Sequence, residues 1–167
     1  MVVQTPVIMD ISKYKQELLS KICSNSKIIE AIDSQQDGAM SSEPDTLIGK
    51  NLFPYMRVPE TENFADTHIM LSVDVERPNR NNRTYSRYHT TIWVLCALNR
   101  MEMPQEYNAT RIDYIAEQLT RMFHNVRNFG FTDFELMSNR EALLDSKFLY
   151  RELVFRCSDL REAVGQR

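Results

Sequence analysis

Residues 67–98, THIMLSVDVERPNRNNRTYSRYHTTIWVLCAL, decide the fold that this sequence predicts. The first half of the stretch alternates, with an apolar residue at every odd position from Ile69 to Val75. The even positions include His68 and Asp74, which are polar. An alternation with a period of two is the signature of a strand that buries one face, so we predict a half-buried strand here.

The second half of the stretch, residues 90–98, is apolar at both odd and even positions, with Trp93 and Leu95 on one side and Ile92 and Val94 on the other. A strand of this kind lies inside a sheet with both of its faces covered. We therefore predict a long hairpin, centred near Arg80, whose second arm is a central strand.

The remaining elements follow from shorter patterns. Apolar residues at helical spacing predict a helix over 11–22 and a helical stub over 26–32. A second amphipathic helix is predicted from Pro104 to Asn128, with these residues on its buried side: Ile112, Ile115, Leu119, Met122 and Val126. On this helix Arg111 and Gln118 are expected to face outward.

Three further strands are expected, over 52–58, 131–137 and 148–157. Pro54 removes a backbone donor, which places the first of these strands at an edge of the sheet. Residues 34–50 form a long polar loop, and residues 159–167 form a polar tail.

These elements define an α+β fold: a mostly antiparallel five-stranded sheet with two helical elements on one face, in the order α-β-β-β-α-β-β. We predict a single domain over residues 1–167. A domain of this length buries about 70% of the surface of its unfolded chain. The composition, 43% hydrophobic and 26% charged with only four glycines, is that of a globular protein.

The totals also exclude some classes of protein. A net charge of -3 argues against a dedicated nucleic-acid binder. Three cysteines with wide spacing, Cys23, Cys96 and Cys157, are expected to be reduced core residues of a protein that folds in a reducing compartment. The start of the chain lacks the pattern of a signal peptide and no stretch is long enough to span a membrane, so we expect a soluble cytoplasmic product with no membrane partner.

The apolar residues on both faces of the third and fifth strands need two covers. Two helical elements can cover one face only, so another copy of the chain or a partner protein is expected to cover the other. Trp93 and Tyr150 are the candidate subunit-interface residues. The alternative is that the polar loop at 34–50 folds back over the sheet.

The candidate side chains for catalysis or metal binding are His68, Asp74, His89 and His124. In a hairpin centred near Arg80, position 74 lies opposite about 86 and position 68 opposite about 92, so these side chains do not converge. No phosphate-binding loop, Cys-x-x-Cys pair or nucleophile elbow is present in the sequence. We predict no catalytic residue, no cofactor and no metal, and expect that the protein is not an enzyme.

The hairpin tip carries Arg77, Arg80, Arg83 and Arg87 against one acidic neighbour, Glu76. Two interpretations remain open. The segment is either a solvated turn, or a basic finger that meets an acidic protein surface or a nucleic-acid backbone.

The order of elements resembles that of the tail terminator proteins of long-tailed bacteriophages. The resemblance rests on three stretches, residues 51–55 (NLFPY), the alternating arm over 69–75, and the closing residues 150–160 (YRELVFRCSDL). It covers most of the chain, from about Ile11 to Leu160.

What the resemblance implies is a virion structural protein at the junction of tail and head. Such a protein forms a homo-oligomeric ring of six that caps the tail tube, ends tail growth and presents a surface to neck or connector proteins. Contact with genomic DNA in the lumen would be transient at most. Two alternatives stay open: another neck, head-tail connector or head-completion protein, or a small nucleic-acid-binding or nuclease domain suggested by the tip arginines.

Overall fold

The computed structural model describes residues 11–33, 47–57, 66–76, 85–127 and 133–160. It contains three α-helices, α1 (Ile11–Cys23), α2 (Ser26–Asp33) and α3 (Arg111–Phe123), within these ranges. The strands are β1 (Leu52–Phe53), β2 (Thr67–Glu76), β3 (Tyr85–Ala97), β4 (Glu135–Leu143) and β5 (Phe148–Leu160). Two short 3-10 helices, η2 (Leu98–Arg100) and η3 (Gln105–Tyr107), lie between β3 and α3.

The five strands form one sheet in the order β1-β2-β3-β5-β4. All neighbouring strands are antiparallel except β1 and β2, which are parallel. The predicted α+β class and the mostly antiparallel five-stranded sheet are therefore confirmed. The prediction of a single domain over residues 1–167 stays a prediction.

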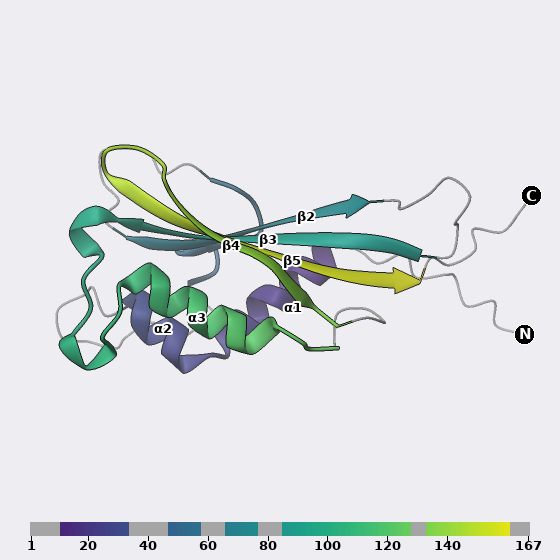
Figure 1. The fold of residues 1–167 in the computed structure, drawn as a ribbon, viewed down its shortest axis with the longest axis horizontal. Helices are drawn as coiled ribbons and strands as arrows, with labels where there is room; N and C mark the ends of the chain where they lie inside the picture. Colours follow the sequence, from purple (N-terminus) through teal and green to yellow (C-terminus); the bar gives the residue numbers. More distant parts are fainter. Residues whose placement is uncertain (1–10, 34–46, 58–65, 77–84, 128–132, 161–167) are drawn as a thin grey trace, which may run out of the picture.

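The helices lie together on one side of the sheet (Figure 1). The odd residues of β2 and the even residues of β3 face them, as the hairpin pattern predicted: Ile69, Leu71, Ile92, Val94 and Cys96 are fully buried. Three aromatic rings pack together in this core. Phe134 stacks on Phe155 with ring centres 4.9 Å apart, and Phe123 meets both rings edge-on. The helix-covered face is thus apolar across β2, β3 and β5.

The three cysteines are buried thiols that form no disulfide with one another, as predicted. Cys157 lies near Tyr14 of α1, whose hydroxyl group also shares a hydrogen bond of 2.9 Å with Thr90 of β3. Burial raises the pKa of Tyr14 far above its ordinary value, so the phenol is neutral and fastens α1 to the sheet.

The second helix begins later than predicted. Pro104 precedes the short helix η3, and α3 itself starts at Arg111 after Thr110, whose side chain accepts a hydrogen bond from the backbone N–H of Asp113. A threonine in the extended conformation is a strong helix cap, and its signal competes with that of Pro104. The sequence pattern therefore located the helix but not its first turn.

Strand boundaries also differ from the prediction. The fourth strand was expected over 131–137, but β4 begins at Glu135 and continues to Leu143 through a bulge between Leu136 and Ser138. Bulges add a residue and interrupt the period of two, which explains why the pattern was misjudged. The fifth strand extends to Leu160, so the first two residues of the predicted tail, Asp159 and Leu160, belong to β5.

The predicted loop at 34–50 is described only from Leu47 onward. Leu47 is buried in the main core, contrary to the expectation of a loop with nothing to pack. Gly49 adopts a positive φ of 85°, a conformation that favours glycine, and its N–H bonds the carbonyl of Leu52. This turn delivers β1 to the edge of the sheet, as predicted. The strand itself is shorter than the predicted 52–58, because β1 ends at Phe53 and Pro54 follows it.

Candidate assembly surfaces

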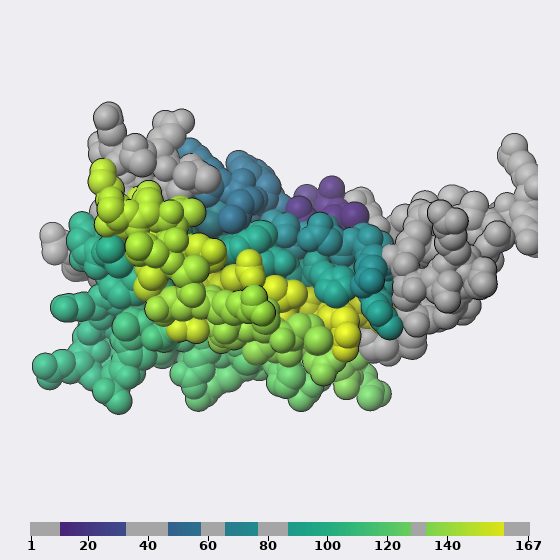
Figure 2. Space-filling view, turned by 45° about the horizontal axis from the view of Figure 1, so that its top comes forward, coloured from purple at the N-terminus to yellow at the C-terminus, as the bar shows by residue number. Residues whose placement is uncertain are grey.

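The side of the sheet that faces away from the helices has an apolar cluster toward one end and ion pairs toward the other. The strands β4 and β5 lie side by side in the space-filling view of Figure 2. At the apolar end five side chains form a separate cluster, each at most 5% exposed: Phe53, Met70, Leu95, Ala97 and Phe148. Trp93 and Tyr150 pack against this cluster and are half-buried. This apolar cluster is therefore small and is already closed within one chain.

The residues after β1 supply part of that cover. Tyr55 packs on the Phe53 ring at 5.8 Å, and the Arg57 guanidinium lies 5.3 Å from the centre of the same ring. The backbone N–H of Arg57 also contacts the Met70 sulfur at 3.2 Å. Leu95, Ala97 and Phe148 are already buried within one chain, so the expectation that they need a second chain to cover them is wrong. The sequence pattern gave no sign that residues 53–57 would pack on this face.

Trp93 and Tyr150, the predicted interface residues, lie on adjacent strands of this face. The Trp93 indole N–H donates to Glu152 at 3.2 Å, and Tyr150 stands opposite Leu95 in the register of β3 and β5. Both side chains keep part of their surface exposed beside a buried cluster. Their role in a subunit interface stays a prediction.

His68 lies at the apolar end and is almost fully buried. Its ring is 5.9 Å from that of Phe53. Burial lowers the pKa of His68. Asp66 opposes this shift, Arg57 adds to it, and the net direction is downward. The imidazole is therefore neutral in the folded protein near pH 7.

At the charged end, two ion pairs connect side chains of four strands. His89 pairs with Glu76 at 3.0 Å, and Arg156 pairs with Glu135 at 3.0 Å. The strand register places Asp74 directly opposite His89.

This register corrects the predicted one, in which Asp74 was opposite 86 and His68 opposite 92. The observed partners are His89 and Leu95, a shift of three residues, since 89 - 86 = 3 and 95 - 92 = 3. The tip sequence lacks an Asn-Gly or Asp-Gly pair that would mark the turn, so its centre could not be located.

The corrected register brings Asp74 and His89 together but leaves His68 six residues further along β2, about 20 Å away at strand spacing. His124 lies elsewhere, where its Nδ1 accepts from the Leu136 N–H at 3.2 Å. Within the described ranges no group of three or more His, Cys, Asp or Glu side chains could hold a metal ion.

Of the four tip arginines, only Arg87 falls within the described residues. It lies on β3 opposite Glu76 and Ser158, at the base of the predicted tip. Arg77, Arg80 and Arg83 lie outside the described residues, so the choice between a solvated turn and a basic finger stays open.

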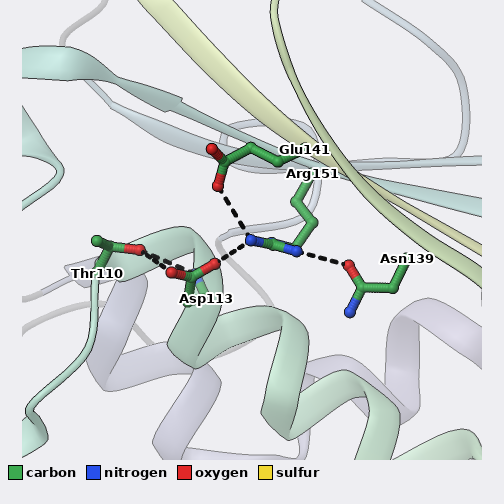
Figure 3. Close-up of polar contacts among 5 residues, drawn as sticks. All are labelled: Thr110, Asp113, Asn139, Glu141 and Arg151. Atoms are coloured by element: carbon green, nitrogen blue, oxygen red, sulfur yellow. Dashed lines mark hydrogen bonds and ion pairs between the residues drawn. The ribbon is translucent and has the colours of Figure 1, made fainter.

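Arg151, which was not among the predicted site residues, connects α3 to the edge strand β4 (Figure 3). Arg151 of β5 is paired with Asp113 of α3 and with Glu141 of β4 at 3.0 Å, and it donates to Asn139 at 2.9 Å. Its side chain is only 19% exposed. Charge-assisted bonds in such a half-buried setting fix the position of β4 relative to the helix layer.

Arg111 was expected to face outward on α3, but it is only 4% exposed. Its guanidinium donates to three backbone carbonyls, those of Ala31 in α2, Arg100 and Glu102. Gln118, also expected outside, is buried as well. Helical spacing could not reveal the burial of Arg111, because one of its acceptors, the carbonyl of Ala31, lies eighty residues earlier in the chain.

Two open strand edges complete the surface. The pairing of β1 with β2 ends at Met70, and no described strand continues it along residues 71–76. At the other side of the sheet β4 pairs with β5 alone among the described strands. Exposed apolar residues lie on both edges, Val75 on β2 and Met137 and Leu143 on β4. Open edges of this kind pair readily with further strands.

These features define a class: a small α+β protein with one sheet, one helical layer and two open edges. A family model, YomW, matches residues 16–157, and the chain belongs to the YomW family. No curated protein matches the sequence. Among the described residues, no helix combines the length and apolar character that a membrane crossing requires.

A solved structure shares this fold. The chain is similar to a chain from a structure titled "Virion of native gene transfer agent (GTA) particle", with a TM-score of 0.59 and 10% sequence identity. The match covers 92% of this chain and 99% of that one. At this identity the similarity establishes the shared fold.

Proposed function

We propose that this protein is a virion structural protein of a phage or phage-like particle. Membership of the YomW family, which is phage-derived, supports this role. The observation that carries the proposal is the fold match with a chain of a gene transfer agent virion, which extends over nearly the whole of both chains.

Within that class, the protein acts as a tail terminator. Copies form a ring, six in number, on the end of the tail tube, where the ring ends tube growth and presents a surface to the neck proteins. The resemblance of the sequence to tail terminators supports this role, and so do the two open edges of the sheet, because repeated head-to-tail contacts close into rings. Its role is structural and non-enzymatic, without metal or cofactor.

The part of the surface that meets neighbours has two candidate components. Trp93 and Tyr150 provide apolar area that is half-exposed beside a buried cluster. Arg77, Arg80, Arg83 and Arg87 form the basic segment, which contacts an acidic neighbour or the passing genome.

Deletion of the gene from a phage or prophage that carries it tests the role. Electron microscopy of the particles should then reveal tail tubes of irregular, excessive length that lack heads, since nothing ends their growth. Tails of normal length that fail to join heads would instead indicate a neck or connector protein. Normal infectious particles would contradict any essential virion role.

The nucleic-acid hypothesis has its own experiment. A gel-shift assay and a divalent-metal cleavage assay on the purified protein should detect neither specific binding nor cleavage. Cleavage that depends on added metal would replace the structural role with that of a nuclease.

A further inference from the structure

The two open edges of the sheet match each other in length, strand direction and hydrogen-bonding pattern. On β4 the regular stretch after the bulge is residues 138–143, and on β2 the stretch beyond β1 is residues 71–76. Each stretch is six residues long, since 143 - 138 + 1 = 6 and 76 - 71 + 1 = 6. Two strands of equal length can pair along their whole extent.

Strand direction fits the same pairing. The antiparallel steps from β2 to β3, from β3 to β5 and from β5 to β4 leave β4 running opposite to β2. Copies related by rotation about a ring axis keep their strand directions relative to that axis. The β4 strand of one copy therefore meets the β2 strand of the next copy in antiparallel orientation.

The backbone groups that point outward also agree. The N–H of Ile69 bonds Asn51 on the outer side of β2, so by alternation the outward groups further along include those of Val73 and Val75. The N–H of Leu144 bonds Phe148 of β5, so the backbone groups of Asn139 and Glu141 point away from β5. Full overlap of the two stretches places Asn139 opposite Val75 and Glu141 opposite Val73, which aligns outward groups with outward groups.

The same register sets opposite charges against each other. Position 140 falls opposite position 74, since 140 + 74 equals 138 + 76 and 143 + 71. Arg140 and Asp74 are exposed and both lie on the helix-free face. Neither has an ion-pair partner in the described part of the chain, whereas the neighbouring Glu76, Glu135 and Glu141 are all paired.

From these observations we propose that β4 of one copy adds to the open edge of β2 in the next copy, antiparallel, with Arg140 facing Asp74. The occupant of each edge is thus a second copy of this chain. The inference rests on the proposed ring and names the surface that closes it. The sheet then continues from copy to copy, and both edges are covered.

Charge reversal tests the pairing. Arg140→Glu and Asp74→Arg should each lower the fraction of ring seen by native mass spectrometry, because like charges then face each other. The double variant should restore the ring. Arg121→Glu, on the outer side of α3, is the matched control and should leave assembly unchanged.

Cysteine cross-linking tests the register without relying on stability. A mixture of Asp74→Cys and Arg140→Cys proteins should form a disulfide-linked dimer on mild oxidation, because directly opposite residues that are not hydrogen-bonded to each other lie about 4.5 Å apart at Cα. Each variant alone should give no covalent dimer. Linkage of a variant to itself would indicate a two-fold contact and overturn the proposal.

The outcomes separate the two proposals. If rings form but no reversal or cross-link affects them, the ring uses another surface, and the edge pairing is wrong while the terminator role stands. If the protein stays monomeric with and without the tail-tube protein, both the ring and the edge pairing are contradicted.

Discussion

The two faces of the same sheet are built differently. The face that meets the helices is apolar from β2 to β5, whereas the opposite face is apolar only around Phe53, Met70 and Leu95 and charged elsewhere. Neighbouring residues of one strand therefore have different roles: on β5, Phe155 is in the core while Arg156 pairs with Glu135 on the other side. Stability depends chiefly on the first face, which leaves the second face and the strand edges free to serve assembly.

Truncation of an aromatic residue on the helix-covered face should give the largest loss of stability. Phe155→Ala removes a fully buried ring that stacks on Phe134, and we expect the free energy of unfolding to fall by about 3–5 kcal/mol. Val154→Ala, one residue away on the opposite face, should cost about 1 kcal/mol. Urea denaturation of both variants measures the two free energies of unfolding. Equal losses would contradict the conclusion that stability depends chiefly on the helix-covered face.

Arg111 supports the helix layer through backbone carbonyls. Arg111→Met leaves the carbonyls of Ala31, Arg100 and Glu102 without this donor, and we expect a loss of about 2–3 kcal/mol. Arg121→Met on the exposed side of the same helix is the control, with an expected change within about 0.5 kcal/mol. A thermal melt that ranks the two variants in reverse would refute the structural role of Arg111.

His68 makes stability depend on pH. Its folded-state pKa lies below the ordinary value of 6.5, so the unfolded chain binds the proton more readily. Its contribution to stability is complete above pH 6.5 and is lost as the pH falls through 6.5 toward the folded pKa. His68→Phe should therefore flatten the fall in stability between pH 7 and pH 5. An unchanged pH profile in His68→Phe would show that other groups cause the fall.

Substitution of the half-exposed aromatic residues should have the smallest effect on stability. Tyr150→Ala is expected to cost about 1 kcal/mol yet to reduce ring formation, since the residue borders the proposed interface. Tyr107→Ala is the control, because Tyr107 of η3 is also half-buried but packs on Tyr114 of α3. Sedimentation analysis of both variants compares assembly, and equal behaviour would remove Tyr150 from the interface.

The alternating pattern of β2 was sufficient to predict its core side, and the two-sided apolar pattern of β3 was sufficient to predict a central strand. Both are local consequences of side-chain alternation. The burial of the three cysteines was predicted from their number and wide spacing and not from their neighbours in the chain.

Features that depend on distant residues could not be predicted. The burial of Arg111 depends on the carbonyl of Ala31, eighty residues earlier. The ion pairs of Arg151 with Asp113 and Glu141 depend on the packing of β5 against β4 and α3. The hairpin register depends on a turn without a marked sequence signal. The cover over Phe53 and Met70 depends on the path of the chain after β1, which has no periodicity of its own.

We propose that copies of this chain close into a ring at the end of a tail tube. Native mass spectrometry of the purified protein, alone and mixed with the tail-tube protein of the same particle, tests this claim most directly. We expect a discrete species of six copies, at least in the mixture. A strict monomer under both conditions would contradict it.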